Sequence, residues 1–230
     1  MPIIPDNMIS SLDAPFSLDG ISMAVKSLGK GKTTGPDGYT DEFYQTYWNI
    51  ISNSFFHAFS EFYENFALPN GWNDIDLIFI PKTNNPSSVR DYRPISLCNV
   101  NYRILSKVLA GRMKLVLNDL ISYNQIAFIR GRSIHDNITV AQEIIHSIYN
   151  SKGKNPYVVV KIDLEKTFDI ISWNVIFGML NHLGFPDKFI NCIESCITYA
   201  TFRYCINNCC SNSFKAHCGI RQGDPISPYL

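Results

Sequence analysis

One acidic residue stands at the end of an apolar stretch, where a carboxylate is costly. Asp163 follows three consecutive valines in YVVVKIDLE, residues 157–165, a pattern that predicts a buried strand. A carboxylate beside a buried strand loses hydration energy unless a partner compensates it, and Mg²⁺ is one such partner. An ordinary strand-end acid in contact with water is the alternative, and the strand by itself favours that alternative.

A second group of candidate residues is basic. Lys82, Arg90 and Arg93 lie around a turn after DIDLIFIPK, residues 74–82, which predicts a short strand. A hairpin at this point would hold the cations over a triphosphate, since Lys and Arg bind phosphate by charge-assisted hydrogen bonds. The stretch NNPSSVRDYRPIS, residues 84–96, is rich in turn residues and predicts a loop.

Residues 218–230, CGIRQGDPISPYL, form a third motif. Gly219 and Gly223 flank Arg221 and Gln222. Glycine lets the backbone approach a ligand closely, and a glutamine side chain can hydrogen-bond to a base or a sugar. Alone, this motif has little specificity.

The stretch GKGKTTG, residues 29–35, looks like a phosphate-binding loop, but its spacing excludes one. Such a loop needs a glycine five residues before the Gly-Lys-Ser/Thr triplet, and that position holds Lys26. The residues before it have helical rather than strand spacing. We therefore expect a helix end followed by a basic loop.

The cysteines offer a metal-binding alternative. Six of the seven cysteines, together with His217, lie in the last 40 residues, and Cys192-x3-Cys196 and Cys205-x3-Cys209 have spacings that suit pairs of zinc ligands. The first pair also has the spacing of a buried helix face, and cysteine is often buried as a small apolar residue. The residues around the second pair predict two short strands about an Asn-Asn turn.

The elements that would position these residues follow from the periodicity of apolar residues. Helical spacing predicts one long or two short helices from Asp41 to Phe66, whose aromatic stripe we assign to the core. That stripe comprises Phe43, Tyr47, Ile51, Phe55, Phe59 and Phe62. Further helices are expected over 18–28, 99–121, 137–151, 172–185 and 190–202. Strands and helices mix without strict alternation, which indicates an α+β fold.

Composition narrows the function only slightly. The chain has 20 basic and 20 acidic residues, so its overall charge indicates no polyanionic partner. Residues 76–132, however, carry 9 basic against 3 acidic residues, a segment that could face nucleic acid or simply contact solvent. No apolar run is long enough for a membrane span, and there is no secretory signal. We expect an intracellular protein with reduced thiols.

The order of the motifs resembles the reverse transcriptases of non-LTR (LINE-type) retrotransposons, most of all those of plants. Five blocks in the family's order, spanning roughly residues 20–230, carry the resemblance. They are GKGKTTGPDGYTDEFYQTYW, LIFIPKTNNPSSVRDYRPISLCNVNYRILSKVLAGRM, NQIAFIRGRSIHDN, VVVKIDLEKTFDIISW and GIRQGDPISPYL. The resemblance implies the fingers and a partial palm of a right-hand polymerase, C-terminally incomplete. It divides the chain into an N-terminal flank (1–19), a fingers-like region with early palm helices (20–156) and a partial palm (157–230).

The resemblance also assigns roles. Asp163 would be the first catalytic aspartate and bind Mg²⁺, while the main chain at Leu164 would touch the incoming triphosphate. Phe168 would be the aromatic gate that excludes a 2′-hydroxyl. The other implied nucleotide-binding residues are Lys82, Arg90, Arg93, Gln222 and Gly223, and the implied template-binding residues are Phe128, Gly131 and Arg132. The implied partners are an RNA template, a DNA primer and deoxynucleoside triphosphates, in the nucleus or cytoplasm.

This sequence departs from the family pattern at several positions. Thr167 replaces a small residue, and Arg130 replaces a proline. The 230 residues hold no Tyr/Phe-Ala-Asp-Asp block, which supplies further metal-binding carboxylates in the family, and Glu165 and Asp169 do not substitute for it. We therefore expect an inactive fragment. A non-catalytic nucleic-acid-binding remnant and a zinc-binding module are the alternatives.

Overall fold

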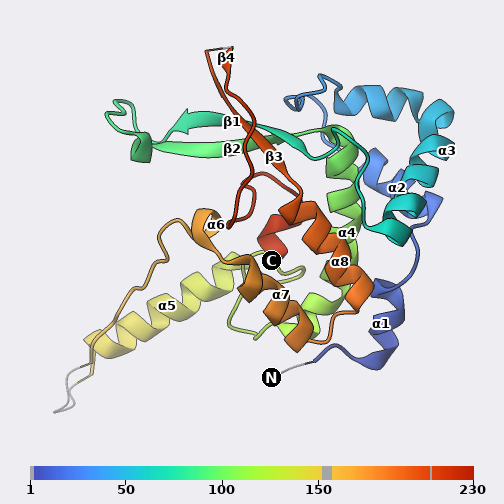
Figure 1. Ribbon diagram of the computed structural model, residues 1–230. Helices are drawn as coiled ribbons and strands as arrows, with labels where there is room; N and C mark the ends of the chain where they lie inside the picture. The colour runs from blue at the N-terminus through green and yellow to red at the C-terminus, as the bar shows by residue number, and fades with distance from the viewer. Residues whose placement is uncertain (1–2, 152–156, 208) are drawn as a thin grey trace.

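The computed structural model describes residues 3–151, 157–207 and 209–230. Within them, helices pack beside one small sheet, whose β1–β2 end projects from the body, in an α+β fold as the sequence predicts (Figure 1). The helices are α1 (Asp6–Leu12), α2 (Leu18–Lys26), α3 (Asp41–Asn65), α4 (Val100–Leu120), α5 (Ile134–Tyr149), α6 (Thr167–Ile170), α7 (Trp173–His182) and α8 (Asp187–Thr198), with 3₁₀ turns η1 (Val89–Asp91) and η2 (Ser227–Tyr229).

The sheet has the strand order β2-β1-β3-β4. Its strands are β1 (Asp74–Pro81), β2 (Tyr92–Cys98), β3 (Thr201–Ile206) and β4 (Cys209–Cys210). β1 and β2 form an antiparallel hairpin, β3 lies parallel to β1, and β4 turns back along β3. The sheet therefore joins two segments that lie more than a hundred residues apart in the chain.

The loop predicted over residues 84–96 is wrong in its second half, where β2 begins at Tyr92. The turn residues and Pro94 argued for a loop, because proline cannot donate to a strand ladder. β2 is an edge strand of the sheet, and an edge strand tolerates proline on its open side.

The hydrophobic core is built around α4. Tyr102, Ile104, Leu105 and Leu109 are fully or almost fully buried on this helix, and α1, α2 and α3 all contact it. Leu12 and Phe16, from the N-terminal 19 residues, are also buried in the same cluster. The amphipathic pattern over 99–121 therefore predicted the central helix correctly.

The predicted aromatic helix is a single helix, α3. Thr40 caps it, because its hydroxyl accepts a hydrogen bond from the amide of Phe43 at 3.2 Å. Phe59 and Phe62 are fully buried, whereas Tyr47 is 47% exposed. Phe43, Ile51 and Phe55 are partly buried and pack against the core, so the assignment of the stripe to the core is confirmed except at Tyr47.

The basic loop after α2 is fixed to the start of α4. Asn99 accepts a hydrogen bond from the amide of Asp37 at 3.0 Å and donates to the carbonyl of Gly71 at 2.7 Å. A Cβ at Gly35 would overlap the backbone at Cys98 and Asn99. Gly35 therefore serves close packing of this loop against the body of the protein.

The strand predicted over residues 157–165 is wrong. Residues 157–164 are extended but pair with no strand among the described residues, and Val158, Val159 and Val160 are 82%, 62% and 72% exposed. A strand of this composition is stable only when neighbouring strands cover its apolar side chains. No such neighbour is present in the described part of the sheet, so the segment remains open to solvent.

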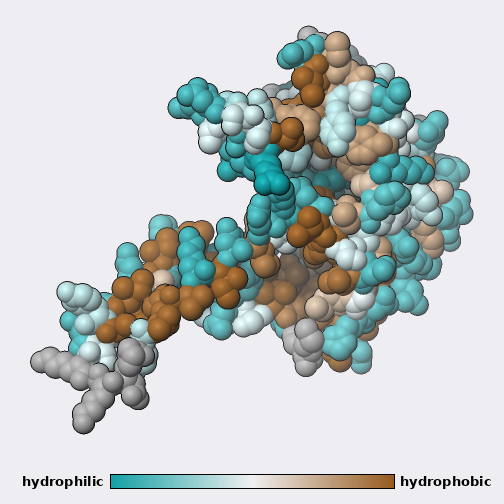
Figure 2. Space-filling view, turned by 60° about the vertical axis from the view of Figure 1, so that its left-hand side comes forward, coloured by the Kyte–Doolittle hydropathy of each residue, from teal (hydrophilic) through white to brown (hydrophobic). Residues whose placement is uncertain are grey.

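Helix α5 also projects from the body. Its apolar residues form an amphipathic pattern, yet none of its residues is buried, and Ile138, Ile144 and Ile145 are each about half exposed. Figure 2 shows brown, apolar side chains along this projecting arm. None of the helices in the described ranges is long and apolar enough to cross a membrane.

Candidate functional site

Backbone hydrogen bonds hold the short helix α6 against residues 219–220. The amide of Ile220 donates to the carbonyl of Phe168 at 2.7 Å, and the amide of Gly219 donates to the carbonyl of Ile171 at 2.8 Å. The indole of Trp173 donates to the carbonyl of Gly219 at 2.8 Å. We call these contacts the α6 strap. They connect the predicted gate residue to the glycine-flanked motif.

Gly219 is required for the α6 strap. Its φ is +84°, and a Cβ at this position would lie 2.9 Å from the carbonyl oxygen of Phe168 and 2.8 Å from that of Asp169. Both the backbone conformation and the close approach exclude a side chain. The glycine therefore brings the two backbones together, rather than approaching a ligand as the sequence suggested.

Phe168, Gln222 and Gly223 meet at one hollow. They line it together with Arg221, Asp224 and Pro228. The carbonyl of Gln222 accepts a hydrogen bond from the amide of Ser96 on β2 at 3.0 Å, which fixes this loop to the sheet. Three of the residues predicted to bind nucleotide are thus neighbours in space, although Phe168 lies 54 positions before Gln222 in the chain.

A larger cavity of about 950 Å³ adjoins them between the sheet and α6. Aromatic rings dominate the sheet side of this cavity. Tyr204 stacks on Phe79 with ring centroids 5.7 Å apart and on Phe214 with centroids 4.7 Å apart. Phe168 and Gln222 line the same cavity. A cavity that combines aromatic rings with a hydrogen-bonding side chain suits a planar, polar ligand such as a nucleobase.

A buried polar network positions the loop from 219 to 224. The Asp224 carboxylate accepts a hydrogen bond from the Tyr102 hydroxyl at 2.9 Å and another from the Ser106 hydroxyl. Burial raises the pKa of the Tyr102 hydroxyl well above its usual range, so this group remains a neutral donor. Both partners lie on α4, so the central helix holds the loop.

Arg221 completes this network. Its guanidinium donates to the side-chain oxygen of Asn73 at 2.6 Å and to the carbonyl of Cys196, and it lies 3.8 Å from the Asp224 carboxylate. The guanidinium also lies over the ring of Tyr102, 4.2 Å from its centroid. Neither Arg221 nor Asp224 was predicted from the sequence to be a positioning residue. Their only signal was a spacing of three residues between opposite charges in an apolar context.

The three predicted triphosphate-binding cations all lie on the β1–β2 hairpin. Lys82 donates to the carbonyl of Arg90 at 2.9 Å, and Arg93 faces Ile80 across the hairpin. All three residues are exposed, and none of them lines the cavity, although Val89 and Tyr92 of the same hairpin do. The hairpin and α5 project toward the same side of the molecule in Figure 1, and Figure 2 shows an open recess on that side.

Asp163 and Leu164 lie outside this cavity. Both residues are exposed, in the extended segment before α6. Among the described residues, the one group of three or more potential metal ligands within reach of a single ion is formed by Asp76, Cys205 and Cys210, and Asp163 does not belong to it. The donor set around Asp163 therefore does not fit a site for two divalent ions, which needs several shared carboxylates.

The predicted template-binding residues occupy the connection between α4 and α5. Phe128 is 61% exposed with a φ of +66°, and Gly131 has a φ of +83°. The Arg132 guanidinium holds the end of α4, because it donates to the carbonyls of Ile121, Ser122 and Gln125. Phe128 is thus free to contact a ligand, while Arg132 has a structural role.

The two departures from the family pattern are tolerated locally. The Thr167 hydroxyl donates to the carbonyl of Leu164 at 3.0 Å in the turn that begins α6. Arg130 is exposed. Neither residue introduces a buried polar group without a partner.

The cysteines do not form the pairs that their spacing suggested. Cys192 and Cys196 are buried in α8, and burial raises the pKa of the Cys192 thiol to about 12. Cys205 is joined by a disulfide to Cys210 rather than paired with Cys209. The helix-face interpretation of the first pair is therefore confirmed.

Comparison with known proteins identifies the family. Residues 80–230 match the model of the family described as reverse transcriptase (RNA-dependent DNA polymerase). The whole chain is 26% identical to part of the Transposon TX1 uncharacterized 149 kDa protein of Xenopus laevis and covers 17% of its length.

Two further relatives are polyproteins. One is the Retrovirus-related Pol polyprotein from type-2 retrotransposable element R2DM of Drosophila melanogaster, 31% identical over 66% of this chain and 14% of the relative. The other is the Retrovirus-related Pol polyprotein from type-1 retrotransposable element R2 of Nasonia vitripennis, 27% identical over 96% of this chain and 21% of the relative. The chain thus spans about a fifth or less of the length of these three relatives.

Proposed function

Because the chain belongs to the reverse transcriptase (RNA-dependent DNA polymerase) family, with relatives in non-LTR retrotransposons, we propose that the cavity beside α6 receives an incoming deoxynucleotide. Family membership implies a nucleic-acid template and nucleotide substrates, and reverse transcriptases use divalent metal ions. The finer assignments are our proposal: an RNA template, a DNA primer, deoxynucleoside triphosphates and Mg²⁺.

One observation carries this proposal. Phe168 and Gln222 line the same cavity as the aromatic residues of the sheet, and the α6 strap fixes their relative position through backbone hydrogen bonds. A ring in this position would collide with a ribose 2′-hydroxyl and leave room for deoxyribose. Gln222 supplies donors and an acceptor for the base or the sugar, and the aromatic residues supply stacking surface.

The hairpin cations would contact phosphate. Lys82, Arg90 and Arg93 are exposed, and no acidic partner forms an ion pair with them among the described residues. Free cations on a projecting hairpin are available to a polyanion. We propose that they bind the triphosphate or the neighbouring nucleic-acid backbone.

We further propose that the 230-residue polypeptide binds nucleic acid without copying it. Among the described residues, the exposed Asp163 belongs to no group of three or more potential metal ligands, and the sequence has no Tyr/Phe-Ala-Asp-Asp block. Polymerisation would then need carboxylates from outside these 230 residues. Non-catalytic binding to nucleic acid is accordingly the second candidate function, for an intracellular protein acting in the nucleus or cytoplasm.

The test combines binding with primer extension. Anisotropy of a labelled RNA–DNA hybrid should show binding that weakens with salt, and the magnitude of the log–log slope should fall by about 0.7–0.9 for each hairpin cation replaced by alanine. Lys26→Ala, an exposed lysine on α2, is the matched control and should leave the slope unchanged.

Primer extension separates the two candidate functions. We expect no DNA synthesis by the isolated 230-residue polypeptide. Mg²⁺-dependent synthesis that disappears in Asp163→Ala would contradict the proposed inactivity and support the catalytic assignment of Asp163. Binding that is independent of salt would contradict the role of the hairpin.

A further inference from the structure

Two cysteines and an aspartate gather on one face of the sheet. Asp76 of β1 lies beside Arg203 of β3 in the parallel register, and Cys205 lies opposite Cys210 of β4. Side chains alternate between the two faces of a sheet, so residues 76, 203, 205 and 210 share one face. Leu77 and Tyr204 belong to the other face, and Cys205 itself also lines the edge of the cavity that they form.

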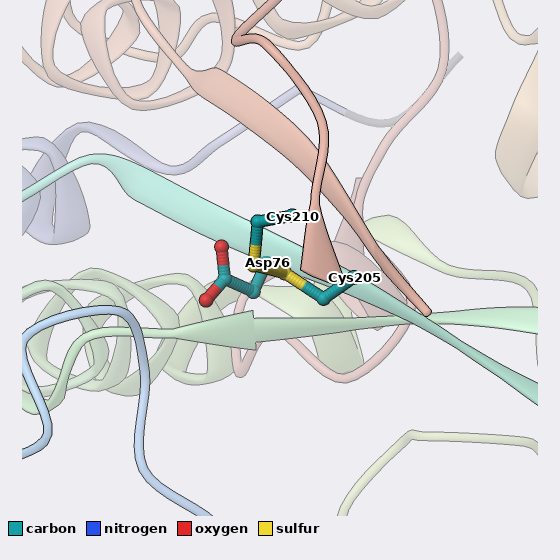
Figure 3. Close-up of side chains that lie close together, drawn as sticks. All are labelled: Asp76, Cys205 and Cys210. Atoms are coloured by element: carbon teal, nitrogen blue, oxygen red, sulfur yellow. A yellow bond between two sulfur atoms is a disulfide. The ribbon is translucent and has the colours of Figure 1, made fainter. Parts of the chain in front are cut away.

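The three candidate ligand atoms are close enough for one metal ion. The carboxylate oxygen of Asp76 and the sulfurs of Cys205 and Cys210 all lie within 4.8 Å of one another. Two ligands of a tetrahedral zinc ion lie roughly 3.5–4 Å apart, given Zn–S bonds of about 2.3 Å and Zn–O bonds of about 2.0–2.2 Å. Figure 3 shows the Asp76 carboxylate beside the two sulfurs.

The charges around the cluster also suit a divalent cation. Arg203 donates to one carboxylate oxygen of Asp76, Oδ1, from Nη2 at 2.8 Å and from Nε at 2.9 Å, which leaves Oδ2 available. Two thiolates, one carboxylate and one guanidinium sum to a charge of −2. Arg203 would act as an outer partner that orients the carboxylate, as hydrogen-bonded partners of metal ligands commonly do.

We propose that Asp76, Cys205 and Cys210 form a zinc-binding site when the disulfide is reduced, with water as the fourth ligand. Reduction by a thiol of the glutathione class transfers two electrons and two protons to Cys205 and Cys210, and two molecules of that thiol become its disulfide. Zn²⁺ then replaces the two thiol protons, which are released to solvent. A reducing compartment favours the dithiol form.

Such an ion would be structural. β3 and β4 share only two register pairs, and the β1–β3 pairing ends at Leu77 and Tyr204. A metal ion held by β1, β3 and β4 would connect all three strands at the end of the β1–β3 pairing. The β3–β4 hairpin would then stay in place beside the aromatic residues of the cavity.

The remaining exposed cysteines supply matched controls. Cys209 precedes Cys210 on β4, so alternation directs it to the opposite face. Cys218 lies away from the cluster and donates weakly to the carbonyl of Asp169 at 3.6 Å. Both thiols are exposed and free, so each reports non-specific zinc binding by a cysteine outside the site.

The experiment measures zinc bound by the full 230-residue chain. The protein is reduced with a phosphine, freed of metal by a chelator and titrated with ZnCl₂, with Co²⁺ as a spectroscopic probe of thiolate ligation. We expect one ion per chain. Affinity should fall at least about 100-fold in Cys205→Ser and Cys210→Ser and about 10-fold or more in Asp76→Asn, because even outer partners contribute 10–100-fold. Cys209→Ser and Cys218→Ser should match the wild type.

Two further measurements test whether the bound zinc occupies this site. Oxidation of the wild type back to the disulfide should release the ion. Zinc should raise the Tm of the reduced wild type and not that of Cys210→Ser, with far-UV circular dichroism confirming that the variant is folded. Equal zinc binding by the wild type and the Cys205→Ser/Cys210→Ser double variant would overturn the proposal, as would a loss of binding in Cys209→Ser equal to that in Cys210→Ser.

Discussion

Replacing Gly219 with alanine should open the α6 strap. Alanine at a φ of +84° costs about 1–2 kcal/mol relative to glycine. The new Cβ would also lie 2.8 and 2.9 Å from two backbone carbonyl oxygens, which cannot rotate away as a flexible side chain would. Relieving this overlap separates α6 from the loop and breaks the two hydrogen bonds between them.

The magnitude follows from these contributions. Each backbone hydrogen bond contributes about 1 kcal/mol net, so together with the backbone conformation we expect a loss of about 3–4 kcal/mol in the free energy of unfolding of the strap region. Urea unfolding followed by circular dichroism measures the global part, and hydrogen exchange at the Ile220 amide measures the local part. Nucleotide binding should weaken in parallel, because Phe168 and Gln222 lose their fixed relation.

A matched glycine provides the control. Gly178 lies inside α7 with no atom near the position of a new Cβ, so Gly178→Ala should stabilise the protein by about 0.5–1 kcal/mol. Ordinary surface substitutions change stability by less than about 0.5 kcal/mol. If Gly219→Ala changed both the global and the local stability by less than this, while Gly178→Ala behaved as expected, Gly219 would not be required for the α6 strap.

Three other predictions follow from the same structure. Asp224→Ala should destabilise the fold by about 3–5 kcal/mol in urea, since it leaves the buried Arg221 charge without its carboxylate; stability equal to the wild type would remove the network from the account. Burial raises the pKa of the Cys98 thiol to about 12, so iodoacetamide at pH 8 should modify exposed Cys218 in the native state and Cys98 only after denaturation. Mass spectrometry of the labelled peptides measures the order, and modification of Cys98 in the native state before Cys218 would contradict its burial. Gly35→Ala should lower the Tm and loosen the basic loop, visible as faster proteolysis between α2 and α3; an unchanged Tm would contradict the close packing at the start of α4.

The sequence predicted best what depends on local pattern. α3 and α4 carry apolar residues at helical spacing along their whole length, and the burial of Phe59 and Tyr102 follows from that spacing. β1 was equally clear, because β-branched and aromatic residues end at a proline. These elements needed no knowledge of their neighbours.

The errors arose where structure depends on distant partners. The segment containing Asp163 has strand composition, but strand formation needs pairing, and the described residues supply none. β2 contains Pro94, which is acceptable only because this strand lies at the edge of the sheet. In both cases the outcome depends on which strands lie next to the segment in the sheet, and the local sequence does not contain that information.

Only part of the site could be predicted, because its supporting contacts also join residues that are distant in the sequence. Motif order placed Phe168 and Gln222 in one function, and the structure brings them to one cavity. The support from Arg221, Asp224 and Tyr102 spans more than 120 residues of sequence, so spacing could not reveal it. Pairing of Cys205 with Cys210 rather than Cys209 depends on the hairpin register, which a one-residue shift would change.

Sugar discrimination by Phe168 tests the central claim most directly. The measurement is equilibrium displacement of a labelled deoxynucleoside triphosphate from the protein bound to an RNA–DNA primer–template, with dATP and ATP as competitors opposite the same template base. The wild type should bind dATP more tightly than ATP. In Phe168→Ala, the ratio of the ATP dissociation constant to the dATP dissociation constant should fall at least about 10-fold, the equivalent of about 1.4 kcal/mol. Equal affinity for both nucleotides in the wild type, or unchanged preference in Phe168→Ala, would contradict the assignment of the cavity beside α6 as the deoxynucleotide site.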